Sequence, residues 1–470
     1  MNGYQKKALI CMLAGFIVLI LFAACSGNKG GAVSTGGAAE TTGFTGTIGN
    51  TLQYDLSKPV NEGKPITIEF WTQNELQKIH EKLITEYTRI HPNVKVNLTP
   101  LAYADLFQQK LPIALQTGTG PDVFHMHNSY DAILRPYLAP YPQDILPIDA
   151  IKADFSQVDA HIVNGELCYI DMGLMTSGIF YNKVMWAEAG LTENDIPTTW
   201  EDFIRIAQKL TVADKNGSII REGFSINGNE NYILILLALQ NGRFLFDESL
   251  NKPVVNDDVW KQSLRFVKDL YDVYKVSSIQ HPPGVEAFAN GQGAMAYQWG
   301  WYGSWLAGYP DLQWGFFVLP TMDGKTPPAY DRNNGEATFS ISKKAAPKVQ
   351  AAAFDLLKFF ICSDNLLAEA DLLLSIAPTK VSLVNHPDIL ANAVLGLQGP
   401  IIDRTIWPGP VPDPYFLTLT TYATQAAILN GIPIETALAE AQNMENRDFV
   451  AAFPDFRTAE RQYAHSNELR

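Results

Sequence analysis

The chain is poor in cysteine. It has four cysteines in 470 residues, and Cys11 and Cys25 lie near the amino terminus, so only Cys168 and Cys362 remain in the body. So few cysteines cannot build a disulfide framework or a cysteine-rich zinc site. We expect Cys168 and Cys362 to be unpaired and buried, with a disulfide between them as the alternative.

Positive charge is also scarce. The 35 Lys and Arg are outnumbered by 49 Asp and Glu, which gives a formal net charge of −14, and no run of basic residues occurs. Nucleic acids and anionic membrane surfaces are bound by clustered positive charge, so we expect no nucleic-acid partner. With 47% hydrophobic and 18% charged residues the chain is too apolar to be disordered, and its length suits about two or three domains.

The sequence motifs of several enzyme classes are missing. No Gly-x-Ser-x-Gly elbow and no phosphate-binding loop occurs, and His80 lacks the second histidine that completes a zinc-protease helix. His125 and His127 share one face if their segment is a strand, but no third metal ligand is evident nearby. We therefore expect them to line a polar cleft, with no metal and no cofactor. No spacing singles out a pair of carboxylates for glycoside hydrolysis.

The amino terminus predicts export. Two lysines precede an uncharged apolar run over residues 8–24, and two alanines stand immediately before Cys25. This is the pattern of a secretory leader, and its end resembles the lipobox of bacterial lipoproteins. We expect residues 1–24 to be a lipoprotein signal peptide and Cys25 to be lipidated, which would hold the body on the extracytoplasmic face of the cell membrane; the alternative is an uncleaved transmembrane anchor. Residues 25–60, which begin rich in Gly, Thr and Ser, are predicted to be a flexible tether.

The first part of the body alternates between strand and helix patterns. Apolar residues recur with period two over residues 66–71 and 94–98 and with helical spacing over residues 76–90 and 106–115, and a third strand follows a helix stop at residues 118–120. This β-α-β-α-β order predicts an α/β fold with an open, mostly parallel sheet and helices on both faces. Ligands of such sheets collect at the carboxyl ends of the strands.

Tryptophan is concentrated in one place. Four of the nine tryptophans lie within sixteen residues, namely Trp299, Trp301, Trp305 and Trp314. Flat indole rings cover the apolar C–H faces of a pyranose, while neighbouring amides and acids bind its hydroxyls. We expect Trp301 to face a ligand of this kind. The alternative for Trp299 and Trp305 is that they only pack the core.

Several motifs also follow one another along the body with a characteristic order and spacing. They occupy residues 66–71, 116–123, 180–183, 197–203 and 288–295. Together they resemble the family 1 extracellular solute-binding proteins, the maltose-binding-protein-like lipoproteins that capture substrates for carbohydrate ABC importers. The resemblance covers nearly the whole mature chain.

The resemblance implies a two-lobed periplasmic-binding-protein fold of the Venus flytrap type (type II). In this fold hinge crossings join two α/β lobes that grip the ligand between them, and here the crossings are expected near residues 169–171 and 318–320. The N-terminal lobe would comprise residues 65–170 and 330–378, and the C-terminal lobe residues 171–329 and 379–470.

The resemblance also implies where the ligand binds. Trp301 matches the stacking ring of the family, and Met175 stands where maltose-binding protein has an acidic sugar contact, which implies a less polar subsite. The expected ligand-binding residues are Gln73, Asn74, Glu75, His127, Asn128, Met175, Trp299, Trp301, Trp305, Glu336, Trp407 and Tyr415.

The function implied by the resemblance is that of a receptor rather than an enzyme. A monomer would bind a sugar or oligosaccharide between its lobes, and the closed form would deliver it to the permease subunits of an ABC importer. Two alternatives stay open. One is a surface-anchored glycan hydrolase, and the other is a binding protein for a peptide, a polyamine or a metal chelate.

Overall fold

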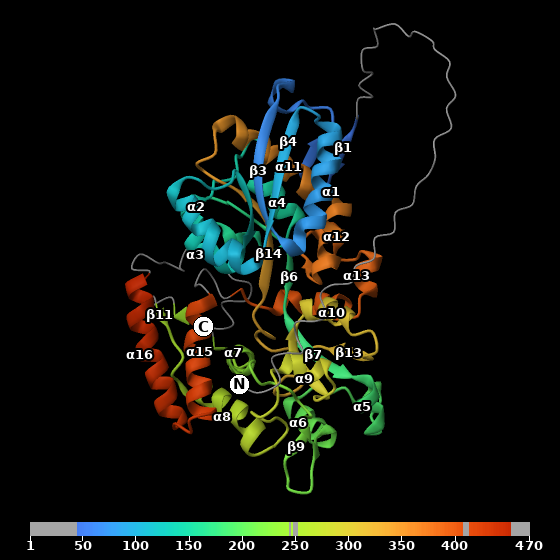
Figure 1. The fold of residues 1–470 in the computed structure, drawn as a ribbon, viewed down its shortest axis with the longest axis vertical. Helices are drawn as coiled ribbons and strands as arrows, with labels where there is room; N and C mark the ends of the chain where they lie inside the picture. Colours follow the sequence, from blue (N-terminus) through green and yellow to red (C-terminus); the bar gives the residue numbers. More distant parts are fainter. Residues whose placement is uncertain (1–44, 244–245, 248–251, 408–412, 453–470) are drawn as a thin grey trace, which may run out of the picture. The chain divides into compact units, whose positions relative to one another are not determined.

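Two β-sheets, each with its own hydrophobic core, organise the protein. The computed structural model describes residues 45–243, 246–247, 252–407 and 413–452. The larger sheet, in the upper half of Figure 1, has six strands in the order β15-β6-β14-β5-β3-β4. These strands are β3 (Ile66–Gln73), β4 (Val94–Leu101), β5 (Val123–His127), β6 (Asp171–Met175), β14 (Asn334–Ile341) and β15 (Ala377–Pro378).

The six-stranded sheet begins as the sequence predicts. β3, α1 (Gln77–Ile90), β4, α2 (Leu111–Thr117) and β5 follow one another, and β3 pairs in parallel with both β4 and β5. Alternate residues of β3, Ile68 and Phe70, are fully buried. The predicted helix stop is confirmed, because Gly118 ends α2 with a φ of 76°, a left-handed conformation that glycine adopts without strain.

The remaining strand pairs of this sheet are antiparallel. β14 pairs antiparallel with β5 and with β6, and β15 pairs antiparallel with β6, so the sheet is mixed rather than mostly parallel as predicted. The reason is that β14 enters the sheet on the chain's return from the second sheet, so no crossover helix fixes its direction. Helices α11 (Pro347–Cys362) and α12 (Asp364–Leu374) follow β14, and Phe360 of α11 stacks on Phe339 of β14 with 5.8 Å between ring centroids.

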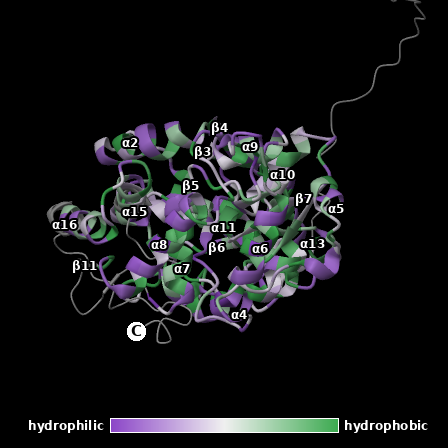
Figure 2. Ribbon diagram, turned by 90° about the horizontal axis from the view of Figure 1, so that it is seen from below, coloured by the Kyte–Doolittle hydropathy of each residue, from purple (hydrophilic) through white to green (hydrophobic). Residues whose placement is uncertain are grey.

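The second sheet has three antiparallel strands in the order β12-β7-β13. They are β7 (Ser177–Asn182), β12 (Met295–Trp299) and β13 (Trp314–Phe317). The helices around its core, in the lower half of Figure 1, are α6 (Trp200–Leu210), α7 (Glu230–Gln240), α8 (Asp258–Asp272), α15 (Asp413–Ile428) and α16 (Ile434–Ala452). Hydrophobic residues, green in Figure 2, gather toward the inside of the ribbon.

Shorter elements complete the described chain. The short helices are α3 (Asp131–Leu134), α4 (Ile148–Asp154), α5 (Lys183–Glu188), α9 (Gly284–Ala289), α10 (Trp301–Trp305), α13 (Pro387–Ala391) and α14 (Leu395–Gln398). Two small hairpins pair β8 (Val212–Ala213) with β9 (Ile219–Arg221) and β10 (Phe246–Asp247) with β11 (Lys252–Pro253).

Two segments connect strands of one sheet to strands of the other, and a third, after β15, leads from the larger sheet to α15 and α16 in the smaller core. A single residue, Thr176, separates β6 of the larger sheet from β7 of the smaller one. On the return, Leu319 and Ala329 still pack in the core of the smaller sheet, and β14 begins at Asn334. Both crossings therefore come later than residues 169–171 and 318–320, where the resemblance had placed them. The first is delayed because β6 pairs with β14 before the chain leaves the sheet.

The tether prediction is wrong for residues 47–60. Strands β1 (Thr47–Gly49) and β2 (Gln53–Asp55) form a hairpin against α11. The hairpin buries Leu52 and Tyr54, and the Tyr54 hydroxyl donates a 2.7 Å hydrogen bond to Asp355 of α11. The apolar side chains of this short segment suffice to anchor it on the larger core, despite the Gly-rich sequence before it.

Several predictions concern residues outside the described part of the chain. The signal peptide over residues 1–24 and the lipidated Cys25 lie there, as do residues 408–412 and 453–470 of the predicted C-terminal lobe. Within the described residues, no helix combines the length and the hydrophobicity needed to cross a bilayer.

Both cysteines of the body are free and buried, as expected. Burial disfavours the thiolate and raises the pKa of Cys168 to about 11 and that of Cys362 to about 12. Because the thiolate is the reactive form of cysteine, neither side chain is suited to nucleophilic chemistry near neutral pH.

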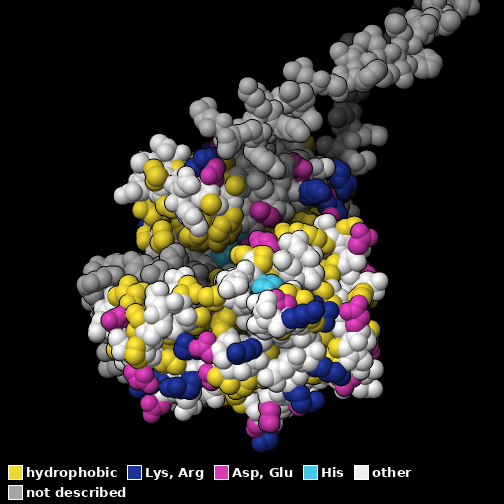
Figure 3. Space-filling view, turned by 60° about the horizontal axis from the view of Figure 1, so that its bottom comes forward, with side chains coloured by type: hydrophobic (Ala, Val, Ile, Leu, Met, Phe, Trp, Pro, Cys, Tyr) yellow, Lys and Arg dark blue, Asp and Glu magenta, His cyan; other side chains and the backbone are white. Residues whose placement is uncertain are grey.

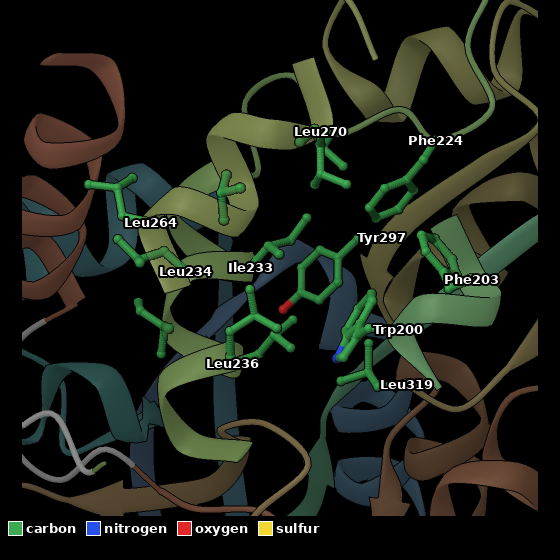
Figure 4. Close-up of a cluster of buried hydrophobic side chains, with 14 of the residues drawn as sticks. Trp200, Phe203, Phe224, Ile233, Leu234, Leu236, Leu264, Leu270, Tyr297 and Leu319 are labelled. Carbon is green, nitrogen blue, oxygen red and sulfur yellow. The ribbon is translucent and has the colours of Figure 1, made fainter. Parts of the chain in front are cut away.

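Trp200 provides a test of the second core. Its ring is 2% exposed, packs among Phe203, Tyr297 and Leu319 (Figure 4), and donates a 2.8 Å hydrogen bond from Nε1 to Gln240. We expect Trp200→Ala to lower the free energy of unfolding by about 3–5 kcal/mol, because it leaves a cavity and an unpaired amide. Urea unfolding measures this loss. Equal stability of the variant and the parent would contradict the packing described.

Candidate ligand-binding site

A cavity of about 450 Å³ lies where the two sheets meet, beside both crossing segments. From the strands and loops of the larger sheet it is lined by Tyr103, His127, Met175, Asn333, Asn334 and Glu336. From the side of the smaller sheet it is lined by Asn229, Tyr232, Val285, Gln298, Trp299 and Trp301. Gly228 and Arg332 complete the lining, so a molecule in this cavity would touch both halves of the fold.

Aromatic side chains line one side of the cavity. Trp299 is the last residue of β12, and Trp301 is the first residue of α10 and is 37% exposed. The residue between them must be small, because a Cβ on Gly300 would lie 2.8 Å from the backbone oxygen of Ser375. Tyr232, near the start of α7, adds a third ring. These rings offer flat apolar faces with polar edges, the surface that suits a pyranose.

His127 and Glu336 face each other on neighbouring strands. They are directly paired in the register of β5 and β14, and the register of β14 shifts just after Glu336, as in a β-bulge that re-aims a side chain. The backbone N–H of Ser129 donates to Nδ1 of His127 at 3.2 Å, and Nδ2 of Asn334 lies 3.3 Å from Nε2 of the same ring. Nε2 of His127 lies 3.8 Å from Oε1 of Glu336.

A layer of buried histidines and carboxylates lies behind Glu336. His125 Nε2 is 3.2 Å from Oε2 of Glu336, and burial lowers the pKa of His125 to about 3. The imidazole is therefore neutral, and it donates a hydrogen bond to the carboxylate rather than forming an ion pair with it. Burial also raises the pKa of Glu336, while His127 opposes that shift. In the same layer His161 Nε2 lies 2.7 Å from Asp171.

The histidines do not form a metal site in the described part of the chain. There, no group of three or more His, Cys, Asp and Glu side chains is arranged to hold a metal ion.

The acidic and basic side chains visible in Figure 3 are interspersed over the face drawn.

A second cavity, of about 480 Å³, lies on the far side of the larger core. Its lining comes from the β1–β2 hairpin and from α1, α11 and α12, and includes Ile48, Phe359 and Cys362. It is enclosed by one half of the fold alone and presents no tryptophan, so it lacks the features that suit a sugar.

Comparison with known proteins assigns the chain to a protein family. The sequence profile described as bacterial extracellular solute-binding protein matches residues 72–361. The chain belongs to this family. Members of the family are extracytoplasmic binding proteins. An arabinooligosaccharide-binding protein of Bacillus subtilis is 24% identical over 331 residues, which cover 67% of this chain and 68% of the relative. A multiple sugar-binding protein of Streptococcus mutans is 23% identical over 309 residues, 62% of this chain and 70% of the relative.

Solved structures show the same fold. An ABC substrate-binding protein of Listeria monocytogenes in complex with cycloalternan superposes with a TM-score of 0.66 at 20% identity, covering 82% of this chain and 99% of its own. The maltose/maltodextrin-binding domain of Bdellovibrio bacteriovorus bound to maltotriose gives a TM-score of 0.66 at 18% identity, covering 82% and 100%. The predicted two-lobed periplasmic-binding-protein fold is therefore confirmed.

Five of the expected ligand-binding residues of this solute-binding protein line the cavity. They are His127, Met175, Trp299, Trp301 and Glu336. His127, Met175 and Trp299 are the last residues of their strands, Trp301 follows β12, and Glu336 is the third residue of β14.

The other expected residues lie outside the lining. Gln73 and Asn128 are buried, and Asn128 points its Nδ2 toward Asp171 at 3.5 Å. Trp407 is buried edge-on against His161, with 4.8 Å between ring centroids. Trp305, although 39% exposed, stacks on Tyr302 at 5.3 Å. Asn74 and Glu75, which follow β3, are exposed and do not line the cavity. The side chain of Tyr415 in α15 lies outside the described part of the structure.

Sequence reasoning missed much of the lining. Arg332, Asn333 and Asn334 come directly before Glu336 on the return crossing, and their closeness to Glu336 in sequence could have suggested them. Asn229 and Tyr232 carry no such signal, because they lie in and just before a helix that is otherwise apolar.

Acidification tests the buried histidine layer. Burial lowers the pKa of His80, with His125 adding to the shift, so His80 is neutral in the fold. In the unfolded chain a histidine binds a proton below about pH 6.5, whereas a buried neutral histidine does not. Each buried neutral histidine therefore lowers the free energy of unfolding by about 1.4 kcal/mol per pH unit below about pH 6.5, until the pH reaches its pKa in the folded protein.

We expect His80→Asn to reduce this pH dependence. An asparagine keeps a hydrogen bond to Thr72, which lies 2.7 Å from Nδ1 of His80, but it cannot bind a proton in the unfolded chain. Between about pH 7.5 and about pH 5, the variant should lose about 2 kcal/mol less stability than the parent in urea unfolding. The buried carboxylates change the free energy of unfolding with pH by the same amount in the parent and in the variant, so their contribution cancels in the comparison. An unchanged pH dependence would show that His80 is protonated in the fold.

Proposed function

We propose that this solute-binding protein captures a sugar or oligosaccharide in the cavity between its sheets and delivers it to the permease subunits of an ABC importer. The observation that carries the proposal is the lining itself. Trp299, Trp301 and Tyr232 supply aromatic faces, and Glu336 and His127 supply hydrogen-bonding groups from the opposite side. Aromatic rings suit the C–H faces of a sugar, and polar groups suit its hydroxyls.

The relatives support this choice of ligand. The two proteins similar in sequence are described as binding arabinooligosaccharides and multiple sugars, and the two solved structures hold cycloalternan and maltotriose. These proteins bind different glycans, so they favour glycans as the ligand class without identifying which glycan this chain binds.

The position of the cavity favours a hinge mechanism. A ligand held there contacts residues carried by both sheets, and the described chain passes between the two halves at three places: Thr176, the segment before β14 and the segment after β15. A ligand that touches both lobes binds the closed form more tightly and shifts the population toward it. We propose the lobes of the sequence prediction, residues 65–170 with 330–378 and residues 171–329 with 379–470, with residues 171–175 moved to the first lobe because β6 pairs there.

We further propose that the protein acts as a monomeric receptor and not as a glycan hydrolase. Glycoside hydrolysis ordinarily uses two carboxyl groups on either side of the scissile bond, and Glu336 is the single carboxylate among the described lining residues. Incubation of the purified protein with a panel of glycans separates the two functions. Stoichiometric binding without product supports the receptor, and turnover of any glycan would overturn it.

Trp301 provides the sharpest test of the site. Once thermal-shift screening has identified a bound glycan, Trp301→Ala should weaken its binding by about 30- to 1,000-fold, or about 2–4 kcal/mol, because a stacking face is lost. Isothermal titration calorimetry measures the change. The matched control is Trp305→Ala, since Trp305 lies on the same short helix with similar exposure (39% against 37%) but outside the lining. Equal affinities of the two variants would refute the proposed placement.

The lipid anchor is tested separately. We propose that Cys25 is lipidated, because two alanines precede it at the end of an apolar leader, as in a lipobox. A bacterial lipoprotein carries at least two acyl chains, and such a pair would hold the protein stably on the membrane. Cys25→Ala should move the protein from the membrane fraction to the soluble fraction. Retention of the variant in the membrane fraction would instead indicate an uncleaved transmembrane anchor.

A further inference from the structure

Arg332 lies in the cavity at a position fixed by the crossing segments. Its backbone N–H donates a 2.7 Å hydrogen bond to Asp331, and its backbone oxygen accepts one of 3.1 Å from Thr176, the single residue of the first crossing. The residue is 6% exposed and lines the cavity. The fold therefore places this cation between the two lobes, where a bound ligand would meet it.

Two aromatic rings hold the Arg332 side chain. Its guanidinium carbon lies 4.5 Å from the ring centroid of Tyr232 and 4.9 Å from that of Trp299. Such cation–π contacts hold the guanidinium group without using its N–H donors. Within the described residues, the guanidinium forms no hydrogen bond and no ion pair.

The nearby carboxylate of Asp331 interacts electrostatically with Arg332 but forms no hydrogen bond with its guanidinium. Asp331 accepts hydrogen bonds from Ser177 and, at 2.7 Å, from the hydroxyl of Tyr297, in addition to the backbone N–H of Arg332. The carboxylate of Glu336 accepts a hydrogen bond from His125 at 3.2 Å and lies 3.8 Å from Nε2 of His127. An anionic ligand in the cavity would supply the hydrogen-bond acceptor that the guanidinium donors lack among the described residues.

From this arrangement we propose that the ligand is an acidic glycan, one whose carboxylate or phosphate group binds to Arg332. The proposal rests on the proposed function and narrows its ligand class. The guanidinium fork matches the two oxygens of a carboxylate or phosphate in a bidentate pair, whereas a neutral sugar presents single hydroxyls. Trp299 and Trp301 then cover the sugar rings that carry or adjoin the charged group.

The test compares acidic glycans with their neutral counterparts. The pairs are trigalacturonate with its methyl ester, xylotetraose with and without a glucuronate branch, and maltose with and without a phosphate. Titration calorimetry should show the acidic member of at least one pair binding about 10- to 100-fold more tightly, and which pair responds distinguishes carboxylate from phosphate. Equal or tighter binding of the neutral member would overturn the inference while leaving the proposed function intact. Binding of no glycan at all would overturn the proposed function as well.

Variants of Arg332 assign the effect to this side chain. Arg332→Gln should weaken the acidic ligand by about 10- to 100-fold and remove its preference over the neutral counterpart, and Arg332→Lys should restore part of the preference. The control is Arg205→Gln, which removes the same charge from a side chain that is 72% exposed on α6, far from the lining. A preference that persists in Arg332→Gln, or one lost equally in Arg205→Gln, would contradict the assignment.

Discussion

The hydrogen bonds around Thr176 hold the binding cavity together. This buried residue, the whole of the first crossing, donates from its side chain to the backbone oxygen of Arg332 on the second crossing at 3.1 Å. Its own backbone oxygen accepts from the N–H of Gly300 at 3.1 Å and from the Gln398 side chain at 2.7 Å. These contacts join both crossings to the turn between Trp299 and Trp301, so a motion of the lobes would pivot where the ligand is held.

The second constraint is the cost of burying charge. Glu336 and Asp171 lie in the interior of the larger sheet, and each is paired with a histidine rather than with a lysine or an arginine. At Glu336 the partner is the neutral His125, which satisfies the carboxylate by hydrogen bonding without adding another buried charge and so limits the desolvation cost. Arg332 differs, since among the described residues its guanidinium lies beside two aromatic rings and interacts electrostatically with Asp331 but has no carboxylate hydrogen-bonded to it.

The sequence predicts the framework of this protein better than its site. The period-two and helical patterns before residue 124 give the β-α-β-α-β unit, because local apolar spacing decides those elements. They cannot give the direction of β14, which depends on a return from the other sheet. Trp301 and Trp305 look alike in sequence, yet only Trp301 reaches the cavity, because α10 is a single turn that directs Trp305 onto Tyr302. Tyr232 of α7 and Arg332 before β14 come into contact only because the chain crosses between the two sheets, and no local sequence pattern predicts this contact.

The central claim is that one glycan bridges the two lobes in the cavity beside Thr176. The most direct measurement is a crystal structure of the protein with the glycan that binds most tightly in solution. It should show a sugar ring against Trp301, with other contacts to Glu336 or His127 of the larger sheet. A glycan found in the cavity beside Cys362, or one that touches residues of a single lobe, would contradict the account.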